Sequence, residues 1–166
     1  LARQYTITLS ARNAGGAGFQ TLALTVLGES SFGPASDNFN NRISLTGTSL
    51  QVKGGNVNAT AQTGEPNPAG FPAAKSIWWT WTAPAAGTVT ISTIGSDFNT
   101  VLAVYTGTNI NTLKAVASDD QSGGSDTSRV TFNTTTGTSY QIAVDGRSDA
   151  VGNIVLNLQF AGAIVA

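Results

Sequence analysis

The sequence predicts an all-β protein: a jelly-roll-type β-sandwich preceded by a separate β-hairpin. Three observations predict this class. Short runs of residues alternate apolar and polar side chains, as strands with one buried face do. Clusters of Gly, Pro, Asn and Ser separate these runs at short intervals, as turns do. Only 10% of the 166 residues are charged, against roughly 25% in an average soluble domain, and Thr, Ser, Asn and Gly stand in their place.

A β-hairpin is the first element that the pattern predicts. Residues 4–11 and 20–27 alternate, and residues 13–16 (NAGG) give the turn signal between them. A lone hairpin is at best marginally stable in water. We therefore expect this hairpin to need a partner sheet.

A linker follows the hairpin at residues 28–36, which carry Gly, Ser and Pro without periodicity. The predicted organisation is thus a hairpin over 1–27, the linker, and a sandwich over 37–166. The first residues lead directly into a strand pattern with no signal peptide before them. We expect the chain to be an internal or processed part of a longer protein.

The sandwich module is predicted from strand-like runs that begin after Asp37. They lie at 43–46, 50–53, 58–62, 76–83, 87–94, 100–106, 113–118, 128–133, 138–145 and 153–161. Strands at this spacing, without helical patterns between them, favour a sandwich or jelly roll. The inward positions predict a core of Ile77, Trp79, Trp81, Val89, Ile91, Leu102, Val104, Val130, Phe132, Ile142, Val144, Ile154 and Leu156. The pattern over 100–106 further predicts a strand that is covered on both sides.

The residue types that are missing exclude several functions. The sequence has no His and no Cys, so a Ser-His-Asp triad, a His-zinc site, a thiol nucleophile and disulfides are all excluded. The net charge is −1 and the basic residues are scattered singly, which argues against nucleic acid as a partner. No apolar run approaches the roughly 20 residues that span a bilayer.

The order of motifs from about residue 37 to 160 resembles the bacterial pre-peptidase C-terminal domain, a family related to the collagen-binding modules of secreted collagenases. The matching stretches are SDNFNNRISLTG, GEPNPAG, KSIWWTWTAPAAGTVTIST, SDFNTVLAVYTG, ASDDQSGGSDTSRVTF, GTSYQIAVDG and GNIVLNL. The resemblance implies a jelly-roll sandwich without catalytic residues. Residues 4–27 resemble the last two strands of bacterial immunoglobulin-like or cadherin-like repeats, so the rest of that module would lie upstream.

The resemblance also implies a candidate calcium site. Calcium-binding relatives take ligands from an acidic segment at the domain entrance and from the loop before the Trp-rich strand. Asp37 and Glu65 match those places, and Asn38 and Asn67 are weaker ligands beside them. Two departures weaken this role: Asn99 stands where relatives often have an acid, and Pro68 where they often have a His. The alternative is that Asp37 caps a turn and Glu65 is solvated.

Three further carboxylates, Asp119, Asp120 and Asp126, lie in the loop SDDQSGGSD. Their spacing does not fit an EF-hand. Asp in Gly- and Ser-rich loops most often accepts hydrogen bonds from nearby backbone N–H groups. We expect that structural role here, and also for Asp97 and Asp145 at strand ends.

The Trp-rich strand supplies a candidate ligand-binding side chain. Period-two alternation sends Trp79 and Trp81 to the core face and Trp78 to the other face. An exposed Trp on a sheet can stack on a sugar or pack against a peptide. The alternative is that the loop over 63–75 covers Trp78.

We therefore expect a non-catalytic accessory module of a secreted or cell-surface bacterial protein. It would mediate adhesion or attachment to extracellular polysaccharide or matrix-like protein, next to the adjoining domains of its parent chain. The alternative is a structural subunit of a filament or array, a homo-oligomer built by strand exchange between neighbours. An enzyme that uses paired carboxylates, such as a glycosidase, has no motif in its support.

Overall fold

The computed structural model describes residues 5–13, 16–24 and 34–162. The chain divides into two compact units, residues 1–32 and 33–166, and each is described by itself. The division falls within the segment that the sequence predicts as a linker. Among the described residues, no helix has the length and apolar character needed to cross a membrane.

The first unit is the hairpin that the alternation predicts. Strand β1 (Tyr5–Asn13) pairs antiparallel with β2 (Gly16–Leu24). The register runs from the Tyr5–Leu24 pair to the Asn13–Gly16 pair. The second strand therefore begins earlier than predicted, at residue 16, because pairing continues up to the turn. Residues 25–27, predicted as strand, lie outside the described residues.

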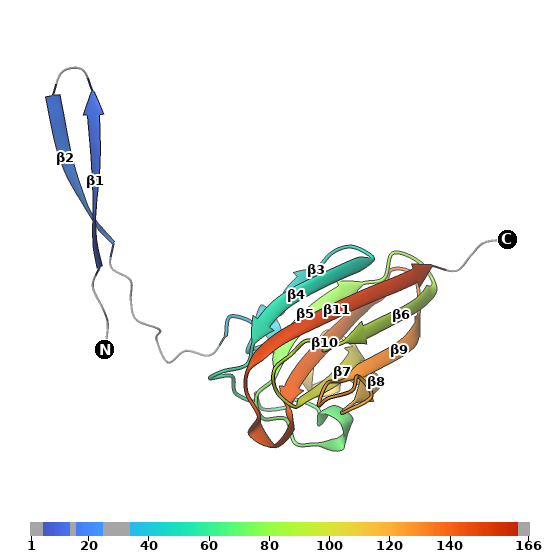
Figure 1. The fold of residues 1–166 in the computed structure, drawn as a ribbon. Helices are drawn as coiled ribbons and strands as arrows, with labels where there is room; N and C mark the ends of the chain where they lie inside the picture. Colours follow the sequence, from blue (N-terminus) through green and yellow to red (C-terminus); the bar gives the residue numbers. More distant parts are fainter. Residues whose placement is uncertain (1–4, 14–15, 25–33, 163–166) are drawn as a thin grey trace. The chain divides into compact units, whose positions relative to one another are not determined.

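The second unit is a β-sandwich of two sheets, as the sequence predicts (Figure 1). One sheet has the order β3-β5-β10-β7-β8 and the other β4-β11-β6-β9. All pairs are antiparallel except β3 with β5. The strands are β3 (Ile43–Leu45), β4 (Ser49–Gly55), β5 (Ile77–Thr82), β6 (Gly87–Ser92), β7 (Thr100–Thr106), β8 (Lys114–Asp119), β9 (Arg129–Thr134), β10 (Ser139–Gly146) and β11 (Asn153–Gly162).

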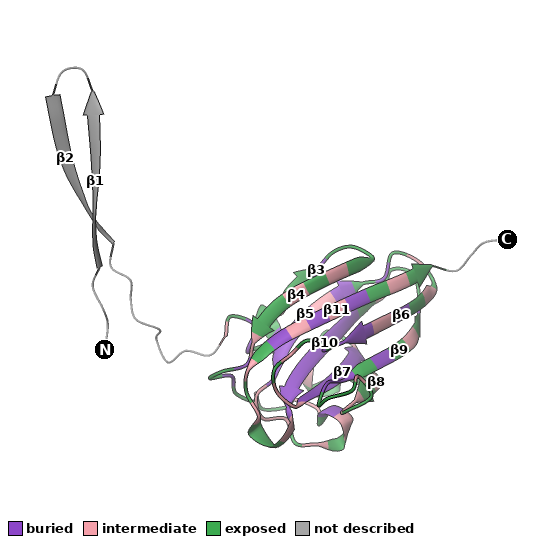
Figure 2. Ribbon diagram, viewed as in Figure 1, coloured by how far each residue is buried: buried purple, intermediate pink, exposed green. Residues whose placement is uncertain are grey.

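The main core lies between the two sheets, where the inward side chains of both meet. Every residue predicted for it is buried except Phe132, which is half-buried and packs against the cluster. Trp81 shows how a polar group is accommodated there, because its indole Nε1 donates to the Gly47 carbonyl at 2.9 Å. Strand β7 is buried along almost its whole length, which confirms that it is covered on both sides (Figure 2).

One predicted strand is wrong. Residues 58–62 form no strand; they belong to the long connection from β4 to β5. Asn58 has a left-handed backbone with φ of 64°, which strands do not use. Thr60 turns its backbone N–H to the Asp37 carboxylate at 2.6 Å. Ala59 is nevertheless buried, because it packs against the main core.

Candidate functional site

A layer of loops covers the outer face of the five-stranded sheet. It consists of residues 56–76, which include the short helix η2 (Pro68–Gly70), and of the short helix η1 (Phe39–Asn41). A second apolar cluster lies beneath this loop layer, apart from the main core. Its members are Phe39, Trp78, Ala103, Tyr105 and Ala143, with Ile110 and Leu113 packed against them.

Trp78 lies at the centre of this second cluster and is only 1% exposed. The Phe39 ring meets it edge-on, with centroids 5.1 Å apart. Its Nε1 donates to Ser76 Oγ at 3.2 Å. Of the two alternatives for Trp78, the covered one therefore holds: the loop layer covers the face to which the alternation sends it, and no exposed surface is left for a ligand.

Glu65, predicted as a calcium ligand, links the loop layer to β5 through hydrogen bonds. Its carboxylate accepts hydrogen bonds from Ser76 Oγ at 2.6 Å and from the Gln62 backbone N–H at 3.0 Å. Trp78 Nε1 lies 3.4 Å from the same carboxylate. Burial raises the pKa of Glu65, and these hydrogen bonds offset part of that rise.

Asp145 is a second buried carboxylate that holds the loop layer. Its predicted structural role as an acceptor of backbone N–H bonds is confirmed, but the sequence did not show that two of its donors come from a distant loop. Its carboxylate accepts hydrogen bonds from the backbone N–H groups of Ala74 (2.8 Å), Lys75 (2.7 Å) and Gly146 (2.7 Å). It thereby ties the end of the loop layer to β10. Burial raises the pKa of Asp145. The signal was available, because alternation from Ile142 and Val144 in the core sends Asp145 to the opposite face.

Asp37, the other predicted calcium ligand, fastens the start of the sandwich to the same layer. Its carboxylate accepts from the Thr60 backbone N–H at 2.6 Å and from Thr60 Oγ1 at 3.0 Å. Asn38 and Asn67 are exposed, and neither side chain caps the short helix that it precedes. Glu65 and Asn67 thus lie in the loop layer, whereas Asp37 and Asn38 lie in the segment that leads into it. The two acids accept hydrogen bonds from different residues of the layer.

This donor set does not fit a calcium ion. Calcium is held by six to eight oxygen atoms, whereas the carboxylate oxygens of Asp37 and Glu65 already face N–H and O–H donors of the protein. In the part of the chain that the structure describes, no group of three or more acidic, His or Cys side chains is placed to hold a metal. Calcium binding at these residues stays a prediction that the contacts do not favour.

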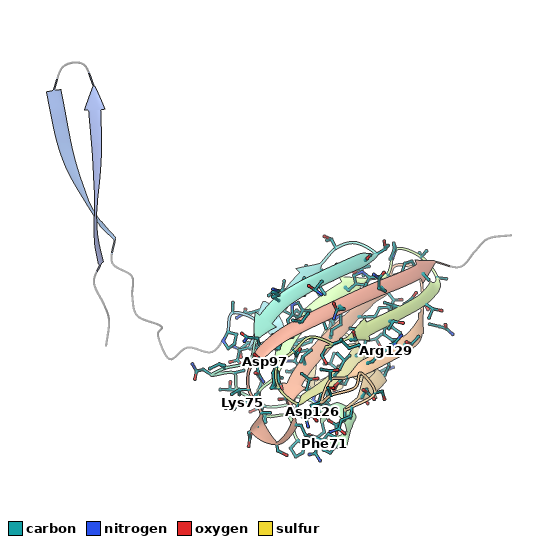
Figure 3. The ribbon with its side chains drawn as sticks, viewed as in Figure 1. Phe71, Lys75, Asp97, Asp126 and Arg129 are labelled. Atoms are coloured by element: carbon teal, nitrogen blue, oxygen red, sulfur yellow. The ribbon has the colours of Figure 1, made fainter. Side chains whose placement is uncertain are left out.

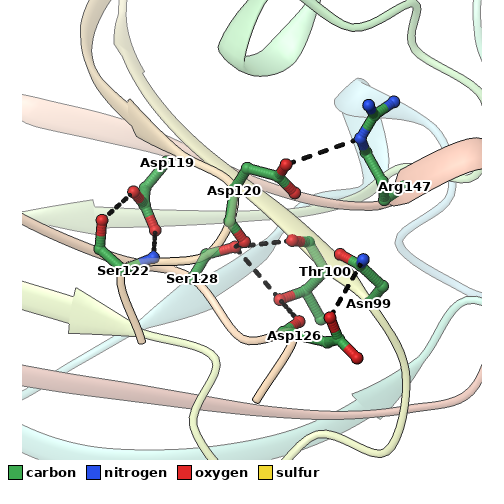
Figure 4. Close-up of polar contacts among 8 residues, drawn as sticks. All are labelled: Asn99, Thr100, Asp119, Asp120, Ser122, Asp126, Ser128 and Arg147. Carbon is green, nitrogen blue, oxygen red and sulfur yellow. Dashed lines mark hydrogen bonds and ion pairs between the residues drawn. The ribbon is translucent and has the colours of Figure 1, made fainter. Parts of the chain in front are cut away.

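The loop between β8 and β9 has the structural character predicted for it (Figure 4). Asp119 accepts from the backbone N–H of Ser122 at 2.8 Å and of Arg129 at 2.9 Å. Its carboxylate therefore holds the loop closed, as Asp residues do in such turns.

The other two carboxylates of this loop contact side chains from neighbouring loops. Asp120 Oδ2 lies 3.6 Å from Arg147 Nε, and Asp126 accepts from Asn99 Nδ2 at 3.4 Å. Asp126 is exposed. These contacts join the loops at this end of the sandwich and form no catalytic pair.

All acidic residues of the described sandwich lie at one end of it. The loops after β4, β6, β8 and β10 meet there, joined by backbone bonds such as Thr93 N–H to Ser128 O and Arg147 N–H to Asn99 O. Figure 3 shows Asp97, Asp126 and Lys75 at this end. The set is Asp37, Glu65, Asp97, Asp119, Asp120, Asp126, Asp145 and Asp149.

The outer face of the four-stranded sheet differs from that of its partner, because no comparable loop layer covers it among the residues that the structure describes. Its outward positions carry hydroxyl and carboxamide side chains on four adjacent strands. We call this surface the open face. Its residues are Ser49, Gln51, Lys53, Thr88, Thr90, Arg129, Thr131, Asn133, Val155, Asn157 and Gln159.

Side chains of the open face bond to one another across the strands. Asn157 is fixed further, because its Nδ2 donates to the Ile94 carbonyl at 2.9 Å. The cross-strand bonds join Gln51 to Asn157 (2.8 Å), Gln159 to Ser49 (2.7 Å), Thr90 to Thr131 (2.9 Å) and Thr88 to Asn133 (3.2 Å).

Two solved structures are similar to this chain in their architecture. The chain is similar to the periplasmic inhibitor of g-type lysozyme PliG from Aeromonas hydrophila, with 18% identity and a TM-score of 0.50 over 72% of this chain and 96% of that one. The fold is shared. The chain is also similar to the pre-peptidase C-terminal domain of Bacillus anthracis collagenase, with 14% identity and a TM-score of 0.46 over 71% of this chain and 92% of that one. No family model and no curated protein matches the sequence.

Proposed function

We propose that the sandwich is a non-catalytic binding module of a secreted or cell-surface bacterial protein, which it attaches to extracellular polysaccharide or protein. The observation that carries this proposal is the open face. It offers exposed hydrogen-bonding side chains that their neighbours and the sheet hold in place. Pre-organised groups lose less conformational freedom when they bind a ligand than free ones do.

The state of the carboxylates supports a non-catalytic role. A glycosidase needs two carboxyl groups that face a substrate, one of them free to donate a proton. Glu65 and Asp145 accept bonds from protein donors beneath the loop layer instead. The sequence has no His or Cys to serve as base or nucleophile.

The fold comparison supports the same proposal. The similar structure PliG is a periplasmic inhibitor of g-type lysozyme, which is in keeping with a binding role for a sandwich of this fold. A module of this kind fits an exported protein that must stay bound to material outside the cell.

Binding to an array of extracellular polysaccharides and matrix proteins tests the proposal. We expect the purified chain to bind at least one of them and to leave it unaltered in length. A matched variant, Thr131→Val with Gln159→Leu, removes hydrogen-bonding groups of the open face and should weaken that binding. Failure to bind any polymer or protein, or release of shortened products, would contradict the proposal.

Assembly by strand pairing is the second candidate, and the topology of the hairpin favours it. The sheet formed by β1 and β2 has only those two strands, so each has an outer edge without a pair among the described residues. Exposed edges invite pairing with another chain. Size-exclusion chromatography over a range of concentrations tests this candidate, which predicts oligomers that grow with concentration; a strictly monomeric chain would contradict it.

A further inference from the structure

We propose that the ligand of the open face is an anionic polysaccharide, whose sugars carry carboxylate or sulfate groups. This inference rests on the proposed function and names the chemical class of its ligand. It follows from the charges on the open face, from its hydrogen-bonding groups and from the lack of apolar anchors.

The charged side chains of the open face are both positive. Lys53 projects from β4 and Arg129 from β9, the two outer strands of the sheet. Both are exposed, and the ion pair of Arg147 with Asp120 is the only one among the described residues. No carboxylate projects from the face. Asp97 stands at its rim, where it is bonded to Asn153.

The distribution of charge over the sandwich favours an anionic ligand on the open face over a cationic one. The acidic side chains gather at the loop end, and two of them, Asp37 and Asp145, are buried. The nearest carboxylates, Asp97 and Asp119, accept hydrogen bonds from Asn153 and from the Arg129 backbone N–H at the edge of the face. The charged side chains that project from the face itself are the two cations, which an anionic polymer lying across the four strands would meet. Because the outer strands of such a sheet are about 14 Å apart, the cations can each bind a separate acidic group of the polymer.

Between the cations lie groups suited to sugar hydroxyls. Each cross-strand bond uses only part of the capacity of its partners: Gln51 Oε1 and Gln159 Oε1 still accept, and Asn133 Nδ2 still donates. A sugar hydroxyl both donates and accepts, so it can bond to carboxamides and Thr hydroxyls alike. The fixed side chains order little further on binding.

A protein partner fits the open face less well. Stable protein interfaces have a core of aromatic or large aliphatic side chains. The open face has no aromatic residue, and Val155, its apolar member, is half-buried. The large aromatic surface of the module lies instead beneath the loop layer and in the main core.

Two pairs of polymers that differ in charge test the inference. Polygalacturonate is compared with fully methyl-esterified pectin, and dextran sulfate with dextran, so that carboxylate and sulfate are probed separately. Affinities of the full chain are measured by titration for wild type, for the double variant Lys53→Gln/Arg129→Gln, and for Lys114→Gln. Lys114 is an exposed cation at the edge of the other sheet, which makes it the matched control.

We expect at least one anionic polymer to bind about tenfold or more tightly than its neutral counterpart. Binding should weaken as ionic strength rises from about 0.01 M to about 1 M, because the Debye length shrinks from roughly 30 Å to 3 Å. The double variant should lose about tenfold in affinity, with its melting temperature unchanged, and Lys114→Gln should bind like wild type.

Equal affinity for charged and neutral polymers would overturn the inference. So would a double variant that binds like wild type, or an equal loss in Lys114→Gln, which would indicate diffuse attraction. If both anionic polymers fail while another polysaccharide or a protein binds, this inference falls and the proposed function stands. If no ligand of any class binds, both fall.

Discussion

Single carboxylates hold the loop layer in place, and Asp145 accepts three hydrogen bonds. Its three bonds come from backbone N–H groups, which an amide cannot accept equally well because its NH₂ would face a donor. We expect Asp145→Asn to lower the free energy of unfolding by roughly 2–4 kcal/mol.

Urea denaturation measures this effect. Asp149→Asn is the matched control, because Asp149 is exposed and has a left-handed backbone with φ of 64° that Asn also tolerates. An Asp145→Asn variant as stable as the control would contradict the role assigned to Asp145.

The raised pKa of Glu65 predicts how the free energy of unfolding changes with pH. Because burial raises its pKa above the ordinary value of 4.5, the folded state binds the proton more tightly than the unfolded state. The stabilisation from the protonated form is fully present below pH 4.5 and is lost as pH rises through the raised pKa.

Glu65→Gln removes this titration while it keeps an oxygen to accept the bond from Gln62. We expect the variant to lose less stability than wild type as the pH rises from acid to neutral. Melting curves over that pH range provide the measurement. A variant whose stability falls with pH as steeply as that of wild type would refute the assignment.

At the scale of elements, Trp78 holds the loop layer against the five-stranded sheet. Its burial by Phe39 and the layer predicts that Trp78→Ala destabilises the fold by about 3–5 kcal/mol. Backbone amides of residues 56–76 should also exchange hydrogen faster, since their apolar support is gone. Val116→Ala, at an exposed position of β8, is the control. Unchanged exchange in the loop layer would contradict this role.

The hydrogen bonds of the loop layer predict how the melting temperature of the protein responds to calcium. The oxygens of Asp37 and Glu65 accept protein hydrogen bonds, so we expect the melting temperature to be the same with excess Ca²⁺ as with a chelator. A clear rise with Ca²⁺ would show that the layer rearranges to form a site, since a ligand bound by the folded state alone stabilises it.

The sequence predicts correctly the strands whose side chains alternate between the main core and the outer face. Strands such as 87–94 and 100–106 are present within a few residues of their predicted ends. Alternation also assigned Trp78 to the outer face correctly. It could not show what covers that face, because the loop layer has no period and is fastened by contacts between distant residues, such as Asp145 with Ala74.

At the scale of the whole molecule, the outer faces of the two sheets of the sandwich differ. One has its outer face covered by the loop layer, and the outward positions of the other carry polar side chains. The acidic residues gather at one end, whereas the opposite loops at 46–48, 83–86, 107–113 and 135–138 contain no charged residue. Sequence patterns gave the polarity of each strand, but the open face exists only once β4, β6, β9 and β11 lie side by side.

Titration of the purified chain with polygalacturonate, followed by the molar mass of the recovered polymer, tests most directly whether the sandwich holds its ligand without reacting with it. The account predicts saturable binding of polygalacturonate or, in a parallel titration, of dextran sulfate. This binding should weaken in Lys53→Gln/Arg129→Gln, and the polymer should be recovered at its original length. Recovery of shortened chains, or binding that ignores the open face, would contradict it.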